Sequence, residues 1–167
     1  MRLISNTHSS FRGLQDDEHG FSNINLVLGN NGDGKTSLLE SIYVSLLGTP
    51  LNSFTRAGRE LSRNNEGLFS SESKAIDHRG NTTIYKFSST NKGRKHLTDD
   101  TKTTIRDAYL STPVCLIDSS IDKIASESPD YRRKLIDRSA FHVEPEHAES
   151  YSKLQKAIKQ RNRAIKN

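Results

Sequence analysis

Eight consecutive residues have the types and spacing of a phosphate-binding loop. The run from Gly29 to Thr36 matches the pattern G-x-x-x-x-G-K-[ST] in full. Its glycines let the backbone curl so that consecutive N–H groups face one anion. Lys35 would reach the β- and γ-phosphates as a point charge, and the Thr36 hydroxyl would sit on Mg²⁺. The sequence therefore predicts a nucleotide site made of Gly29, Asn30, Asn31, Gly32, Asp33, Gly34, Lys35 and Thr36.

The segments on either side are those that such a loop requires. Residues 21–28 are apolar at several positions and end at Gly29, which predicts a buried strand. Residues 35–47 carry apolar side chains at helical spacing, and Gly48 with Pro50 would end that helix. The N-terminus of the helix adds the positive end of its dipole to the loop. A glycine-rich turn that binds nothing is the alternative.

Other segments predict a mixture of short strands and helices. Strands are expected over 2–6, 73–77, 82–88, 95–98 and 114–117, with a hairpin turn at 78–81. Helices are expected over 105–110, near 118–120, over 129–138 and from 144 onward, and the stretch 52–71 is expected to be a loop with a short helix.

One acidic residue follows the second apolar strand candidate. Asp118 comes directly after Val114–Ile117, and a carboxylate at the end of a buried strand can hold Mg²⁺ and orient a water molecule. The alternative is an ordinary strand that ends in a helix-capping Asp. Cys115 lies within the same segment, where an inert core thiol is expected. As the only cysteine, it excludes an internal disulfide and favours a reducing compartment.

The positive charge is concentrated in the last segment. The net charge of the 167 residues is +5, and the stretch 153–166 has six basic residues and no acidic one. Apolar residues in this stretch recur at helical spacing. The helix is either a solvated one with a basic exterior or a surface that meets phosphate backbones or an acidic partner. The longest apolar run has four residues, so no membrane span is expected. The low apolar content and the helix without a stop signal suggest a fragment.

Further residues give the chain a resemblance to the RecF family of ABC- and SMC-type ATPases. The loop contains the Asn-Gly-x-Gly-Lys-Thr form that is typical of these proteins. Collinear with it are Phe11-Arg12-Gly13, Leu39-Glu40-Ser41-Ile42-Tyr43, Tyr131-Arg132-Arg133, Leu135-Ile136-Asp137, Phe141-His142, Glu144-Pro145 and Lys159-Gln160-Arg161-Asn162, each similar to a family motif. The resemblance covers the whole chain, although the family is about twice as long.

The resemblance implies an α/β fold, a P-loop NTPase of ABC/SMC-head type. It implies a mixed sheet, a phosphate-loop helix and a small antiparallel β subdomain, incomplete at the C-terminus. Residues 1–128 would form the ATP-binding lobe, which is the first half of the head. Residues 129–167 would be a helical segment that begins the arm-like subdomain.

The resemblance also implies a role in recombinational DNA repair and replication, with ATP and Mg²⁺ as cofactors. The family binds single-stranded, double-stranded or gapped DNA, forms an ATP-dependent homodimer, acts with RecO and RecR in loading RecA, and takes part in the SOS response in the cytoplasm. Arg12 would contact the nucleotide. The DNA contacts would be Arg132, Arg133, Lys153, Lys156, Lys159 and Arg161.

No catalytic residue is assigned within the chain. The ABC signature and the Walker B acid lie in the second half of the family, so Asp118 does not correspond to that acid. The chain alone would therefore bind ATP weakly and not turn it over. Two alternatives remain: a self-contained P-loop enzyme of kinase type that uses Asp118, and a degenerate fragment that binds neither ATP nor DNA.

Overall fold

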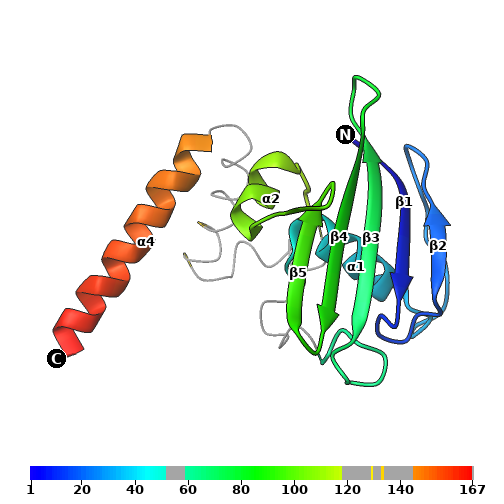
Figure 1. Cartoon of the computed structure of the whole chain (residues 1–167), viewed down its shortest axis with the longest axis horizontal. Coiled ribbons are helices and arrows are strands. Elements are labelled where there is room, and N and C mark those ends of the chain that lie inside the picture. The colour runs from blue at the N-terminus through cyan, green and yellow to red at the C-terminus, as the bar shows by residue number, and fades with distance from the viewer. Residues whose placement is uncertain (52–58, 118–128, 130–132, 134–144, 167) are drawn as a thin grey trace. The chain divides into compact units, whose positions relative to one another are not determined.

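The computed structural model describes residues 1–51, 59–117, 129, 133 and 145–166 (Figure 1). The chain divides into two compact units, Met1–Ala108 and Tyr109–Asn167, and each is described by itself. Among the described residues, no helix is both long and apolar enough to cross a membrane.

The first unit is a six-stranded sheet with a helix on one face (Figure 1). The strand order is β2-β1-β3-β4-β5-β6. The strands are β1 Arg2–Ser9, β2 Asp17–Gly20, β3 Phe69–Ile76, β4 Thr82–Thr90, β5 Gly93–Thr98 and β6 Thr101–Lys102. Every pairing among them is antiparallel, so within the described residues the expected mixed sheet is an antiparallel one. Short turns join β3 to β4, β4 to β5 and β5 to β6, which antiparallel neighbours allow and parallel neighbours do not, whereas the phosphate loop and helix α1 (Lys35–Leu47) lie between β2 and β3.

The expected hairpin between 73–77 and 82–88 is confirmed, with longer strands. Ile76 of β3 pairs with Thr82 of β4. The carboxylate of Asp77 accepts hydrogen bonds from the backbone N–H groups of Arg79 and Asn81, at 2.7 and 2.9 Å. A short side chain that bonds its own turn in this way stabilises a reversal of the chain.

The helix after the loop is confirmed over its whole predicted length. Helix α1 covers Lys35–Leu47 and ends at Gly48, which has a φ of 69°. The Gly48 N–H donates to the Val44 carbonyl at 2.9 Å. A left-handed residue at this position closes the last turn, and glycine adopts that conformation without steric cost.

The interface between α1 and the sheet is unusually polar. Ser41 and Ser45 of α1 face Asn6, Ser71 and Ser73 of the sheet, and all five are buried. The Asn6 amide donates to both sheet serines at 3.0 Å, the Ser41 hydroxyl donates to the Asn6 carbonyl oxygen at 2.8 Å, and the Ser45 and Ser73 hydroxyls bond at 2.7 Å. These bonds satisfy groups whose burial would otherwise be costly.

An apolar cluster completes the interior of this unit. It contains Phe11, Val44, Leu61, Phe69 and Phe87. The rings of Phe11 and Phe69 meet edge to face, with centroids 5.3 Å apart. The cluster joins the loop after β1 to α1 and to two central strands, so it holds the helix against the sheet.

Two segments that were expected to be buried strands are not strands in the structure. Residues 21–28 and 114–117 pair with no strand of the described chain. Leu26 is 81% exposed and Ile117 is 72% exposed. Cys115 is exposed, so the expected core thiol is also wrong. An apolar run becomes a buried strand only where a neighbour bonds its backbone along its length and covers its side chains. In the run 21–28 the Phe21 N–H bonds the Ile4 carbonyl of β1, but no strand pairing continues along the run and most of its side chains are exposed.

The remaining helices agree with expectation where they are described. Helix α2 covers Ile105–Ser111, and helix α4 covers Pro145–Lys166. In the helix expected over 129–138, Pro129 and Arg133 are described and both are helical. The rest of that helix, the one near 118–120 and residues 52–58 of the expected loop lie outside the described residues.

Candidate functional site

The run Gly29–Thr36 is a loop that leads directly into α1. Gly32 and Gly34 have φ angles of 94° and 95°, and Gly34 is the residue that begins the helix. These are left-handed conformations that a residue with a Cβ rarely adopts. When left-handed residues alternate with ordinary ones, successive backbone N–H groups point toward the same side. This arrangement, called a nest, binds anions.

The carboxylate of Asp33 closes the loop on itself. It accepts a hydrogen bond from the Asn30 backbone N–H at 2.5 Å. A Cβ on Gly29 would lie 2.9 Å from the Asp33 Oδ2 atom, so a side chain there would displace the carboxylate. Asp33 therefore shapes the loop from within, a role that its place in the motif does not reveal.

Lys35 lies over the loop rather than away from it. Its Nζ atom donates to the carbonyl oxygens of Gly29 and Asn30 at 2.7 and 2.6 Å. No side chain caps the N-terminus of α1. An ammonium group and uncapped helix N–H groups thus meet at one loop, which suits a bound anion. Thr36 is exposed in the first turn of the same helix.

The segment after β1 forms a wall beside the loop. A Cβ on Gly34 would lie 2.7 Å from the Cδ2 atom of Leu14, so the loop backbone and this side chain are in close contact. The Arg63 guanidinium donates to the Leu14 carbonyl and to the Asp16 carboxylate, the latter at 2.5 Å. Sequence reasoning did not identify this wall, because its members are far apart in the chain.

Hydrogen bonds hold Asp16 in its charged form. Its carboxylate accepts from the Ser9 hydroxyl at 2.6 Å and from the Ser10 N–H at 2.9 Å. The Ser9 and Ser10 bonds, with a smaller contribution from Arg63, lower the pKa of Asp16 to about 2. At neutral pH the ionised carboxylate of Asp16 therefore holds the wall in place through its hydrogen bonds.

Arg12, the expected nucleotide contact, forms an ion pair with α1. Its guanidinium lies 2.5 Å from the Glu40 carboxylate, which is almost completely buried. Burial raises the pKa of Glu40, and the charge of Arg12 opposes that effect. The pair fastens the loop after β1 to the phosphate-loop helix. A contact between Arg12 and a nucleotide stays a prediction.

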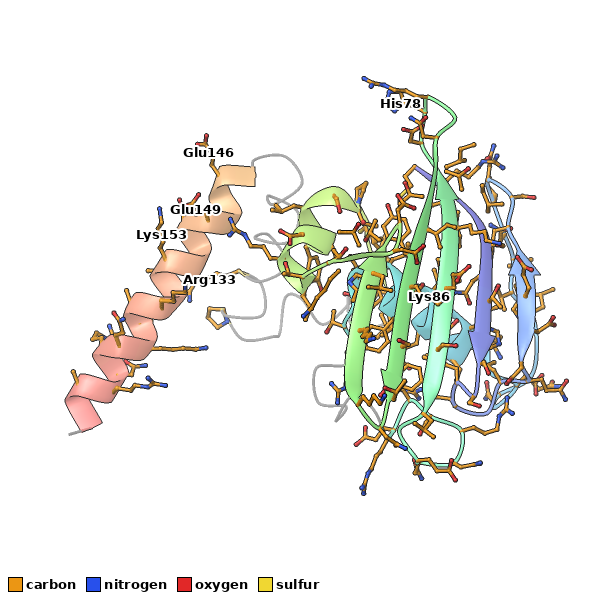
Figure 2. All side chains as sticks on the ribbon, viewed as in Figure 1. His78, Lys86, Arg133, Glu146, Glu149 and Lys153 are labelled. Atoms are coloured by element: carbon orange, nitrogen blue, oxygen red, sulfur yellow. The ribbon has the colours of Figure 1, made fainter. Side chains whose placement is uncertain are left out.

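The expected DNA-contacting residues are described in part. Lys153, Lys156, Lys159 and Arg161 are exposed on α4. Figure 2 shows Lys153 beside Glu149, and their charged atoms lie 2.8 Å apart. Arg133 is exposed and helical. Arg132 and Asp118 lie outside the described residues.

Curated RecF proteins are similar to this chain along nearly its whole length. The chain is 30% identical over 172 residues to the DNA replication and repair protein RecF of Shewanella oneidensis, and the match covers 100% of this chain and 46% of the relative. RecF of Aliivibrio salmonicida is 31% identical over 174 residues, covering 99% of this chain and 45% of the relative. The chain thus spans less than half the length of these relatives.

Solved structures share the fold. The recombination mediator protein RecF with ATP, in the RecFOR pathway, superposes with a TM-score of 0.85 at 20% identity, covering 99% of this chain and 44% of that one. A structure from work on ATP-driven dimerization and DNA-stimulated activation of SMC ATPases gives a TM-score of 0.61 at 18% identity, covering 83% of this chain and 99% of that one. The fold is therefore the expected α/β P-loop type of RecF and SMC heads.

The family match extends through both the phosphate loop and the final helix. The AAA domain family matches residues 8–167. The chain therefore belongs to the AAA domain family and is similar to the N-terminal part of RecF.

Proposed function

We propose that the loop Gly29–Thr36 binds the phosphates of ATP with Mg²⁺. The main support is that three features meet at one loop. They are the left-handed backbone of Gly32 and Gly34, the uncapped N-terminus of α1 and the ammonium group of Lys35. This donor set fits a polyphosphate, and the Asp33 carboxylate is held within the loop by the Asn30 N–H. The similar solved RecF structure, which holds ATP, supports the same ligand.

Each group in the loop has a distinct task in this proposal. Lys35 exchanges its two carbonyl partners for phosphate oxygens, which carry more negative charge. The loop N–H groups and the start of α1 hold the rest of the phosphate chain. Thr36, exposed in the first helical turn, supplies its hydroxyl to Mg²⁺. Bound Mg²⁺ neutralises phosphate charge.

At the level of the whole protein, the proposed role is in DNA repair and replication. The names of the similar proteins support an ATP-dependent DNA-binding protein of RecF type. The proposal extends to RecO and RecR as partners, to RecA loading and the SOS response, and to an ATP-dependent homodimer in the cytoplasm. The exposed basic residues of α4 and Arg133 are the proposed contacts to DNA phosphates, together with Arg132.

A titration of this chain with ATP and Mg²⁺ tests the core of the proposal. Lys35→Ala should weaken ATP binding by about tenfold or more, because one charge-assisted contact contributes on the order of 1.5–3 kcal/mol. Lys86→Ala is the matched control. Its ammonium pairs with Glu72 at 3.1 Å on the sheet face opposite α1 (Figure 2).

The control should bind ATP as the unmodified chain does. Equal affinity for ATP in the Lys35→Ala variant and the unmodified chain would refute the assignment of the loop.

A further inference from the structure

The loop Gly29–Thr36 contains one carboxylate among its anion-binding groups. Lys35 and Asp33 are its two charged residues, so the loop carries no net charge. The side chain of Asp33 is exposed. The loop therefore has to hold a polyphosphate with its backbone N–H groups and one ammonium group while a negative charge stays beside them.

The carboxylate and the ammonium group are bonded to the same dipeptide. Oδ2 of Asp33 accepts a hydrogen bond from the Asn30 N–H at 2.5 Å. The Lys35 ammonium donates to the carbonyl oxygens of Gly29 and Asn30, at 2.7 and 2.6 Å. The two charged groups are thus less than about 10 Å apart, which is the range of electrostatic interaction at 0.1 M salt. A phosphate bound by Lys35 therefore lies close enough to the carboxylate to be repelled by it.

Within the described residues, the Asp33 carboxylate has no ion-pair partner. Its hydrogen bond comes from a backbone N–H, and the Lys35 ammonium bonds carbonyl oxygens instead. The carboxylate of Asp16, by contrast, bonds the guanidinium of Arg63. Repulsion between Asp33 and a phosphate is therefore reduced only by that N–H group, by water and by salt.

We propose that Asp33 makes the loop selective for ATP bound to Mg²⁺ over ATP without a metal ion. Metal-free ATP brings its full negative charge to the carboxylate, whereas bound Mg²⁺ neutralises part of that charge. Asp33 is thus a specificity-determining residue of the nucleotide site. The inference rests on the proposed function, because it requires the phosphates of ATP to lie beside Lys35.

Titrations with ATP at low salt, in excess Mg²⁺ and in EDTA, test the inference on this chain and on its Asp33→Asn variant. Asparagine keeps an oxygen that can accept the Asn30 N–H and removes the charge. The variant should bind metal-free ATP about threefold tighter or more, and should gain less for Mg²⁺-bound ATP. The gain should shrink as the salt concentration is raised, which a mere change in loop shape would not cause.

Two further variants separate charge from shape and position. Asp33→Ala also removes the bond to Asn30, and it should lose the preference for Mg²⁺-bound ATP to the same extent as Asp33→Asn. Asp100→Asn is the matched control, because it removes the same charge from the exposed turn between β5 and β6. Leu14, which precedes β2, contacts the loop, and β6 lies at the opposite edge of the sheet from β2. This control should bind both forms of ATP as the unmodified chain does.

Several results would overturn the inference. One is unchanged affinity of Asp33→Asn for metal-free ATP, which includes no measurable binding by either protein. Others are an equal gain for both forms of ATP, a gain that persists at high salt, and loss of the preference in Asp33→Ala alone, which would assign it to the hydrogen bond. Lys35→Ala keeps the proposed function separate. That proposal fails if Lys35→Ala binds ATP as the unmodified chain does, and it stands if binding weakens, whatever Asp33→Asn shows.

Discussion

Replacing Gly48 by alanine should destabilise the first unit by about 2–5 kcal/mol. Gly48 ends the helix that carries the phosphate loop and has a φ of 69°. Forcing a residue with a Cβ into this region costs about 1–2 kcal/mol. The new methyl group would also lie 2.7 Å from Nδ1 and 2.9 Å from Cγ of His96, and overpacking of this kind costs about 1–3 kcal/mol.

The ring of His96 cannot move away without a loss of its own. It is buried, and its Nε2 atom lies 2.8 Å from the carbonyl of Ser45, one of the last-turn acceptors of α1. An N–H at Nε2 therefore satisfies a carbonyl that the helix leaves unpaired. A shift of the ring would break this bond, which is why the steric cost is expected to persist after relaxation.

Urea unfolding followed by circular dichroism measures the change, with Gly80→Ala as the matched control. Gly80 also has a positive φ, of 88°, but a Cβ there would meet nothing within 4 Å. The control should lose only the backbone contribution, about 1–2 kcal/mol. His96→Ala, which removes the ring, should reduce the difference between the two glycine variants to near zero. Equal losses for Gly48→Ala and Gly80→Ala in the presence of His96 would refute the reasoning.

Two further predictions concern buried ionisable groups. Glu40→Ala should destabilise the first unit by about 3 kcal/mol in the same urea assay, because the half-buried charge of Arg12 loses its partner carboxylate. A loss below about 1 kcal/mol would show that the ion pair contributes little to the stability of this unit. Burial lowers the pKa of His8 and of His96 from the ordinary 6.5. The unfolded chain therefore takes up protons more readily than the folded one, and the midpoint of thermal unfolding should fall as the pH drops below about 6.5. In the His96→Gln variant, the midpoint of thermal unfolding should change less with pH between 7.5 and 5.5. This range lies well above the pKa of Asp16, so that carboxylate does not contribute. An unchanged slope of the midpoint against pH would contradict the assignment to His96.

Local features of the sequence predicted the glycine-rich turn at Gly29–Thr36 and the helix that follows it, whereas phosphate binding by that turn stays a prediction. The spacing of Gly32, Gly34 and Lys35 reflects backbone angles and a charge that the loop needs wherever it occurs. Helix α1 was predicted over its full length, because its apolar spacing and the terminal Gly48 act within a few residues of one another. The hairpin at Asp77 was predicted for the same reason.

Contacts between distant residues were not predictable in this way. The wall made by Leu14, Asp16 and Arg63 joins residues nearly fifty positions apart. Arg12 could be named as important from its motif, but its pairing with Glu40 depends on how the loop after β1 lies against α1. The serine and asparagine side chains between α1 and the sheet resemble surface residues in the sequence, yet they are buried because they satisfy one another.

Residue types and short spacings by themselves determined the glycine-rich turn, the ammonium group beside it and the helix that begins there. Tertiary structure alone decided whether an apolar run such as 22–28 becomes an interior strand, since that outcome depends on a neighbour that supplies hydrogen bonds and cover. Short-range geometry is encoded within a few residues, whereas burial is a property of what the rest of the molecule brings alongside.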